Sequence, residues 1–223
     1  MSHELATRYA SVKAMLPAHV MLVAVSKTRT SAEVKALYEL GQRDFGENYA
    51  QELKEKQAEL PTDIRWHFIG HLQRNNVKLI APFVHLIHGI DNERLLDEVD
   101  KRAQALHRTI DVLLQVHVAK EETKHGFAPE ELRIACRSWS PERWPHVRMR
   151  GLMGMATNTE DNEVIRSDFK LLAVLRKELS ALPDFSNAPF DQLSMGMSAD
   201  LGIAIEEGST MVRIGTALFG PRS

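Results

Sequence analysis

The feature that most constrains the fold is a regular alternation of short apolar segments with longer helical patterns along the whole chain. The apolar segments have the length and composition of buried parallel strands. The predicted strands are residues 21–25, 43–47, 64–69, 83–87, 112–118, 147–153, 192–195 and 211–214. Because parallel strands need crossover connections that are usually helical, this order predicts eight successive βα units.

Helical patterns fill the segments between these strands, and one more precedes the first strand. The leading segment ends at Pro17 and is predicted to be an amphipathic helix. Its apolar positions are Leu5, Tyr9, Val12 and Leu16. After the first strand, Ser31 is the expected N-cap of a helix that stops at Gly41. Further helices are expected over residues 47–60, 92–106, 129–137 and 162–182.

Eight βα units in 223 residues predict an α/β fold, a single-domain (β/α)₈ TIM barrel with an extra N-terminal helix, over residues 1–223. An open, doubly wound sheet is the alternative. Such sheets that bind dinucleotides carry a Gly-rich loop after the first strand, whereas here Val25 is followed by Ser-Lys-Thr. The closed barrel is therefore favoured.

Composition narrows the classes of partner. With 43% hydrophobic residues the chain can bury a substantial core, and its formal net charge of −2 does not indicate a partner such as nucleic acid or an anionic membrane. Cys136 is the lone cysteine, and the polar start of the chain lacks the apolar core of a signal peptide. We therefore expect a cytoplasmic monomer with small-molecule partners.

Lys27 is the first candidate for chemistry, because it lies two residues beyond the first apolar segment. Active sites of (β/α)₈ barrels lie where strands end and βα loops begin. A lysine partly removed from water there has a lowered pKa, which makes its amine a competent Schiff-base nucleophile. A strand-end lysine taken alone is nevertheless more often an ordinary surface residue.

The loops after the seventh and eighth strands carry small residues that can bind an anion. Ser194 and Ser198 follow the seventh strand, and Gly215 and Thr216 follow the eighth. Hydroxyl groups and backbone N–H groups donate to phosphate, and a helix expected to begin near Ser198 would add its N-terminus. Such residues are common in turns, but phosphate sites of this fold are often built after strands seven and eight.

Arg213 lies two residues before Gly215, so strand alternation places both on the inner face or at the mouth of the barrel. An arginine there can contact a ring nitrogen or a carboxylate, or form a buried ion pair. A lysine, a phosphate site and an inward arginine together fit a phosphorylated aldehyde. Sugar phosphates and pyridoxal phosphate both qualify.

Six ordered motifs make the sequence resemble the pyridoxal phosphate homeostasis protein family, which is similar to the barrel domain of alanine racemase. They are AVSKT at 24–28, FGENY at 45–49, WHFIGHLQRNN at 66–76, GLMGM at 151–155, LSMGMSADL at 193–201 and VRIGTALFG at 212–220. The resemblance covers nearly the whole chain. Asn76, His117 and His125 depart from the family pattern, and all three lie outside the predicted phosphate site.

The resemblance implies that Lys27 holds pyridoxal 5′-phosphate as a Schiff base, and that the protein acts in intracellular homeostasis of this cofactor as a carrier or buffer. The other implied contacts are Ser194, Ser198, Gly215 and Thr216 around the phosphate, Arg213 at the pyridine nitrogen, and Asn48 and Met155 near the ring. Free amino acids are expected to reach the cofactor, and contacts with pyridoxal phosphate-dependent apoenzymes are expected to be transient.

Other reactive residue types receive no functional role. Two histidine pairs have ligand-like spacing but begin on predicted strands, so no metal site is expected: His67 with His71, and His85 with His88. Carboxylates near strand ends are interpreted as solvated or helix-capping groups: Asp44, Glu47 and Asp91. Three methionines are interpreted as packing residues: Met153, Met195 and Met197.

A carrier is favoured over an efficient enzyme. A cationic Arg213 beside the pyridine nitrogen disfavours its protonation and weakens the ring as an electron sink. Racemases of the similar family use a tyrosine from a second domain, whereas this sequence ends at Ser223 and offers Tyr49 as the one site candidate. A low-activity amino-acid racemase that uses pyridoxal phosphate and a Schiff-base sugar-phosphate aldolase are the alternatives.

Overall fold

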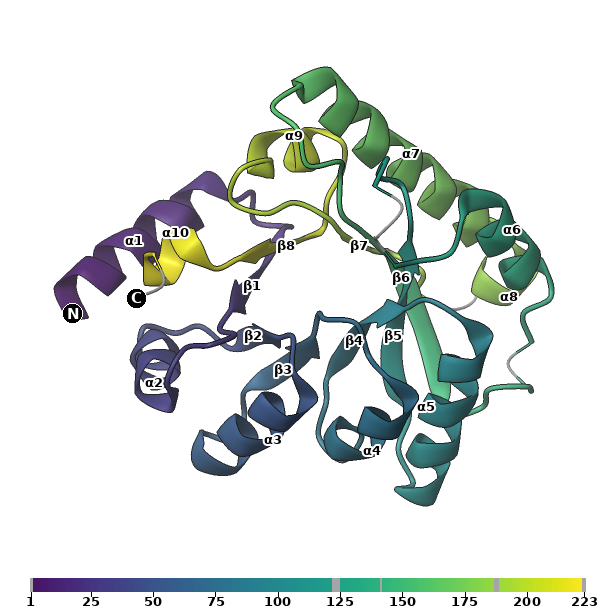
Figure 1. Cartoon of the computed structure of the whole chain (residues 1–223), viewed down its shortest axis with the longest axis horizontal. Coiled ribbons are helices and arrows are strands. Elements are labelled where there is room, and N and C mark those ends of the chain that lie inside the picture. Colours follow the sequence, from purple (N-terminus) through teal and green to yellow (C-terminus); the bar gives the residue numbers. More distant parts are fainter. Residues whose placement is uncertain (1, 122–124, 141, 187–188, 222–223) are drawn as a thin grey trace.

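A computed structural model describes residues 2–121, 125–140, 142–186 and 189–221. In this part of the chain, eight parallel strands follow one another around a closed barrel, and β8 pairs with β1 (Figure 1). The strands are β1 (Met21–Val25), β2 (Asp44–Glu47), β3 (Arg65–Phe68), β4 (Leu86–Ile90), β5 (Ile110–Val116), β6 (Val147–Gly154), β7 (Gln192–Ser194) and β8 (Met211–Ile214). The predicted (β/α)₈ barrel is confirmed.

Helices surround the barrel and connect its strands (Figure 1). They are α1 (Ser2–Met15), α2 (Ser31–Glu39), α3 (Ala50–Glu59), the 3₁₀ helix η1 (Arg74–Asn76), α4 (Val77–Ile80), α5 (Glu93–Ala105), α6 (Pro129–Arg137), α7 (Asn162–Ser180), α8 (Pro183–Ser186), α9 (Leu201–Glu206) and α10 (Thr216–Phe219). The extra helix α1 packs against α10, where Arg8 Nε donates to the carbonyl oxygen of Leu218 at 2.9 Å. Among the described residues, no helix is long and apolar enough to cross a membrane.

Local capping explains where the helices begin. Thr30, rather than Ser31, is the N-cap of α2, because its hydroxyl accepts from Glu33 N while the Glu33 carboxylate accepts from Thr30 N. Asn92, the first residue of the helix predicted over 92–106, is the N-cap of α5, and its side-chain oxygen accepts from Leu95 N at 2.9 Å. These caps fix the points at which the loops of the barrel mouth turn into helices.

The barrel interior combines an apolar cluster with buried polar side chains. The apolar cluster contains Val23, Leu86, Leu113, Met153 and Met211. The buried polar side chains that reach across the interior are His67, His88, Ser194 and Arg213. A second, larger apolar layer lies between the strands and the surrounding helices. Close packing of both layers holds the strand ends, and therefore the loops at the mouth, in fixed positions.

Several predicted bounds differ from the structure: the fifth strand lies at Ile110–Val116 rather than 112–118, and the helix expected over 47–60 begins at Ala50. Two further differences bear on the barrel interior and the site. The fourth strand is shifted from 83–87 to Leu86–Ile90, since its second half includes the polar and small residues His88 and Gly89, which interrupt the apolar pattern. The helix expected near Ser198 instead begins at Leu201, after the N-cap residue Asp200. Ser198 therefore lies in the loop after β7, before the helix.

Candidate functional site

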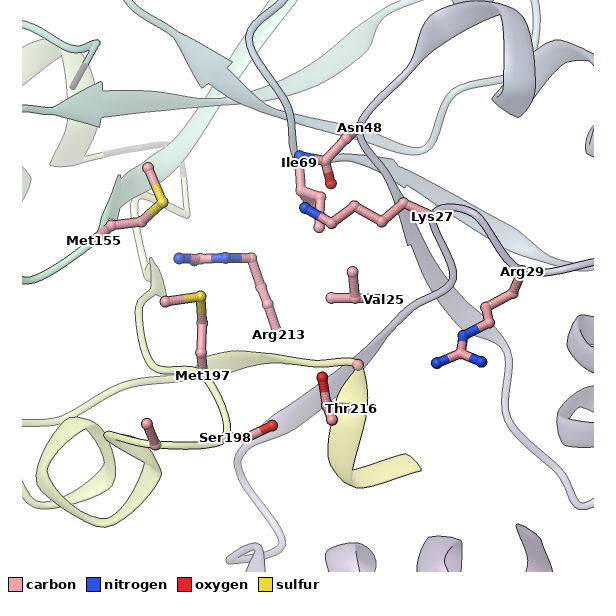
Figure 2. A pocket seen from close by; sticks show the side chains of 12 residues that line it. Val25, Lys27, Arg29, Asn48, Ile69, Met155, Met197, Ser198, Arg213 and Thr216 are labelled. Carbon is pink, nitrogen blue, oxygen red and sulfur yellow. The ribbon is translucent and has the colours of Figure 1, made fainter. Parts of the chain in front are cut away.

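A cavity of about 330 Å³ opens at the carboxyl ends of the strands (Figure 2). It is lined by Val25, Lys27, Arg29, Asn48, Ile69, Met155, Met197, Ser198, Ala199, Arg213, Gly215 and Thr216. This set includes seven of the eight predicted cofactor-binding residues, the exception being Ser194. Residues from six different strand ends or βα loops thus converge on one space, as in the active sites of this fold.

Lys27 enters the cavity from the loop that follows β1. Figure 2 shows its amine extending toward Asn48 and above the guanidinium group of Arg213. The next residue, Thr28, has φ of 63°, a left-handed conformation that is unfavourable for a β-branched side chain. Its backbone N–H donates to Glu52 Oε1 at 2.6 Å, which holds this turn in place.

A buried ionic cluster anchors the residue on the other side of Lys27. Lys56 donates to the carbonyl oxygen of Ser26, to Glu47 Oε1 and to Glu52 Oε1, each at 2.7 Å. The hydroxyl of Ser26 also donates to Glu47 Oε1, at 2.6 Å. Burial raises the pKa of Glu47, and the attraction of Lys56 partly opposes this change. Backbone contacts on both sides therefore fix the turn that carries Lys27.

Asn48 lines the cavity from the end of β2. Its side-chain oxygen is buried and has no hydrogen-bond partner among the described residues, so it is available to a ligand. Gly70 permits the close approach of the two loops here, because a Cβ atom at this position would lie 2.4 Å from the backbone oxygen of Asn48. The orientation of Asn48 thus depends on a neighbour without a side chain.

The other side of the cavity is formed by the loops after β7 and β8. Ser198 and Thr216 are exposed residues that present hydroxyl groups here, and Gly215 is the N-cap residue of α10 (Figure 2). The loop before α9 is held by Asp200, whose Oδ1 accepts from Met197 N at 2.6 Å. Small residues, hydroxyl groups and a helix start form a donor set suited to phosphate.

Arg213 forms the floor between these two sides. Its guanidinium group donates to the carbonyl oxygen of Ser194 at 2.9 Å, to Ser194 Oγ at 2.7 Å and to the carbonyl oxygen of Gly154 at 3.1 Å. Within the described residues, no carboxylate lies within ion-pair distance of it. Burial lowers the pKa of Arg213 to about 10, and Asp200 partly opposes this change, so the group is cationic at neutral pH.

Ser194 does not line the cavity, although the sequence suggests a phosphate contact. Its side chain is fully buried, one layer deeper in the barrel than the loop residues, and its hydroxyl group contacts Arg213 and His88. Strand alternation correctly predicts that it points inward but says nothing about its depth. Ser194 supports Arg213 from below.

Several cavity residues are absent from the predicted site. Met197 lines the cavity opposite Lys27, next to Met155, and is 42% exposed, which is unexpected for a packing residue (Figure 2). Val25, Ile69 and Ala199 add apolar surface. Met197 directly precedes Ser198, a predicted phosphate contact, and this position is the signal by which the sequence could have placed it at the cavity. Strand alternation alone does not distinguish a side chain that lines the cavity from one that packs in the core.

Four of the histidines fall into two separate groups. His67 and His88 are buried inside the barrel and hydrogen-bonded to each other. At the rim, His71, Asp91 and His125 bring ligand-type atoms within 4.8 Å of one another, a grouping that the sequence spacing does not reveal. His71 Nδ1 pairs with Asp91 Oδ2 at 3.2 Å, and the rings of His71 and His125 stack with their centroids 3.9 Å apart.

Comparison with known sequences decides the family. The chain matches the alanine racemase N-terminal domain family over residues 2–223. A pyridoxal phosphate homeostasis protein from Pseudomonas aeruginosa is 42% identical over 207 residues, which cover 92% of this chain and 86% of that protein. The chain belongs to the pyridoxal phosphate homeostasis protein family. The human protein of that name is 43% identical over 213 residues, which cover 90% of this chain and 76% of the human protein.

Solved structures with a similar fold support the assignment to the pyridoxal phosphate homeostasis protein family. PipY of Synechococcus elongatus, determined with pyridoxal phosphate bound, has a TM-score of 0.87 and 36% identity, and the match covers 97% of this chain and 100% of that chain. Alanine racemase from Bartonella henselae has a TM-score of 0.73 at 17% identity, covering 99% of this chain and 61% of that chain. The second likeness shows the shared barrel fold alone. The predicted resemblance is confirmed.

Proposed function

We propose that this protein binds pyridoxal 5′-phosphate in the cavity at the barrel mouth, with Lys27 as the attachment residue, and that it acts as a carrier or buffer of the cofactor. The observation that carries the proposal is the convergence in one cavity of an amine, a buried amide oxygen without a partner, a guanidinium group and a small hydroxyl-rich loop pair. The cofactor bound to PipY and the names of the relatives support it.

Each residue has a distinct part in this binding. When bound, the cofactor supplies an aldehyde that condenses reversibly with an amine, and we propose that Lys27 provides the amine. Ser198, Gly215 and Thr216 would hold the phosphate, whose negative charge suits the helix start at Gly215. Asn48 and Met155 would border the ring.

Arg213 favours a carrier over a racemase. Its cationic guanidinium group would meet the pyridine nitrogen and disfavour protonation of the ring. A racemase also needs an acid/base group on each side of its substrate, and in the similar family a tyrosine supplies one of them. All three tyrosines of this chain fall within the described residues, and none of them lines the cavity. Tyr49, the sequence candidate, is 59% exposed and lines a neighbouring hollow.

Reduction with borohydride tests the attachment residue. The purified protein is loaded with pyridoxal phosphate, reduced, and mapped by peptide mass spectrometry, alongside Lys27→Ala and the control Lys78→Ala, which removes an exposed lysine of α4. We expect one modified peptide containing Lys27, retained in the control and lost in Lys27→Ala. Modification at another lysine, or equal labelling of Lys27→Ala, would contradict the proposal.

The alternatives and the partners have separate measurements. A Schiff-base sugar-phosphate aldolase would be colourless and would not take up pyridoxal phosphate, whereas the carrier becomes yellow on loading. Sustained turnover of single amino-acid enantiomers would indicate a racemase. We further propose a cytoplasmic monomer that meets amino acids and apoenzymes transiently; sedimentation velocity checks the monomer, and a stable complex with an apoenzyme would contradict the transient contact.

A further inference from the structure

A continuous hydrogen-bond chain runs through the barrel from Arg213 to the opposite end. Arg213 Nη1 donates to Ser194 Oγ at 2.7 Å, and Ser194 Oγ lies 3.0 Å from His88 Nδ1. His88 Nε2 lies 3.0 Å from His67 Nδ1, and His67 Nε2 lies 3.1 Å from Asp44 Oδ1. Asp44 stands at the start of β2, so the chain connects the cofactor cavity with the amino-terminal end of the barrel.

The Asp44 end fixes the proton positions from one side. Burial alone would raise the pKa of Asp44, but hydrogen bonds from His67 and Arg65 lower it to about 2, so its carboxylate is ionised and can only accept. His67 Nε2 must therefore carry a hydrogen. In a neutral imidazole this leaves His67 Nδ1 as an acceptor, which requires His88 Nε2 to donate.

The Arg213 end gives the same answer independently. Arginine only donates, so Ser194 Oγ accepts from it and must direct its own hydrogen elsewhere. Among the described residues, the other hydrogen-bonding neighbour of this hydroxyl is His88 Nδ1. His88 Nδ1 is then an acceptor and His88 Nε2 a donor. Both ends thus require the same tautomer of His88, in which Nε2 carries the hydrogen and Nδ1 accepts, with every bond of the chain satisfied.

A second hydrogen on His88 would break this order. It would place two donors face to face, either with Ser194 or with His67. The surroundings also oppose a charge there: His88 is fully buried, burial is the largest cause that lowers its pKa, and the positive charge of Arg213 lowers it further. The chain therefore has one stable direction of donation, from the arginine toward the carboxylate.

We propose that His88 is a positioning residue, which orients the Ser194 hydroxyl and thereby fixes the Arg213 guanidinium group under the cofactor, while Asp44 supplies the negative charge at the far end. This arrangement holds an arginine in place without a carboxylate beside it. Such a carboxylate would neutralise the charge that the cavity presents. The part that concerns the cofactor rests on the proposed function.

The proton positions can be tested in the full-length protein without any cofactor. ¹⁵N NMR of the imidazole nitrogens should show a hydrogen on Nε2 of both His67 and His88, and none on Nδ1 of His88. A hydrogen on Nδ1 of His88 would overturn the proposed direction of donation. Because this measurement does not involve pyridoxal phosphate, its outcome is independent of the proposed function.

The positioning role can be tested by release of pyridoxal phosphate to a scavenging amine, followed by visible absorption. His88→Leu removes the acceptor and should accelerate release about tenfold, as expected for loss of a hydrogen bond that orients a charged group. His88→Asn places an amide oxygen near the position of Nδ1 and should restore most of the slow release. Equal release from His88→Leu and wild type would overturn the positioning role.

Ser209→Ala is the matched control, because Ser209 is an equally buried serine whose hydroxyl lies within hydrogen-bond distance of the backbone oxygens of Leu193, Met195 and Met211 and does not contact Arg213 or His88 in the described residues. It should lower the unfolding temperature without changing cofactor release, whereas Ser194→Ala should accelerate release as His88→Leu does. If release followed unfolding temperature across all four variants, the role of His88 would be structural only, and the positioning role would be wrong.

Discussion

Removal of the Lys56 ammonium group should destabilise the protein more than any ordinary surface change. Lys56 is 5% exposed and contacts Glu47, whose side chain is fully buried. Lys56→Met keeps an unbranched apolar side chain of similar length without the ammonium group, and it leaves the Glu47 carboxylate with the Ser26 hydroxyl as its remaining close donor. Breaking a buried ion pair by removing one partner costs about 3–5 kcal/mol, and we expect a loss of at least ~3 kcal/mol in the free energy of unfolding.

The loss should depend on pH in a defined direction. The pKa of Glu47 is already raised by burial, and removal of Lys56 raises it further. A carboxyl group whose folded-state pKa exceeds its unfolded value contributes stability below the unfolded pKa and loses that contribution as pH rises through the folded pKa. The difference between wild type and Lys56→Met should therefore be smaller near pH 5 than near pH 8.

Urea denaturation at both pH values measures this difference. Lys54→Met is the matched control, because Lys54 is an exposed residue of the same helix and should change the free energy of unfolding by less than about 0.5 kcal/mol. Adding Glu47→Gln to Lys56→Met removes the unpaired charge and should recover much of the loss. A Lys56→Met protein within about 1 kcal/mol of wild type at pH 8, or a double variant as unstable as the single one, would refute the reasoning.

Three further changes have simple readouts. Asp44→Asn should cost about 2 kcal/mol at pH 7 in urea denaturation, and the deficit should shrink as pH falls from about 4 toward 2, because a pKa lowered to about 2 stabilises the folded state only above that range. Gly70→Ala should abolish retention of pyridoxal phosphate on gel filtration, since its Cβ would lie 2.4 Å from the Asn48 backbone, whereas Gly202→Ala has open space and should retain it. Cys136, buried with a pKa raised by burial to about 12, should react with a thiol reagent only as the protein unfolds; rapid reaction of the folded protein would contradict this.

The sequence predicts the apolar strands next to the site well, but it misses the polar residues inside the barrel. The bounds of β1 and β8 agree with the prediction, because both strands are apolar runs with clear limits, and Lys27 and Gly215 follow from their ends. Hydrophobic patterning does not find His88, since a polar residue inside a barrel ends an apolar pattern rather than extending it. The shift of the fourth strand and the overlooked His67–His88 contact have this one cause.

Depth is the second quantity that a linear sequence does not contain. Ser194 and Ser198 are equally plausible phosphate contacts as sequence neighbours, yet one is fully buried beneath Arg213 and the other is exposed at the mouth. The three-residue strand β7 ends at Ser194, so the loop begins only after it. Strand alternation gives the side of the sheet, whereas the register of the closed barrel gives the depth.

The polar interior is costly for a barrel of this size, and that cost supports a functional reason for it. Replacing buried polar networks by apolar residues is often neutral or stabilising, so folding alone does not require His67 and His88 in place of a larger apolar cluster. The network is nevertheless satisfied from Asp44 to Ser194, and it ends on Arg213 at the cavity. With an apolar interior, the guanidinium group would keep its hydrogen bonds to backbone oxygens and to the Ser194 hydroxyl. The Ser194 hydroxyl, however, would have no partner such as His88 to orient it. The polar residues are therefore best explained by what they do for Arg213.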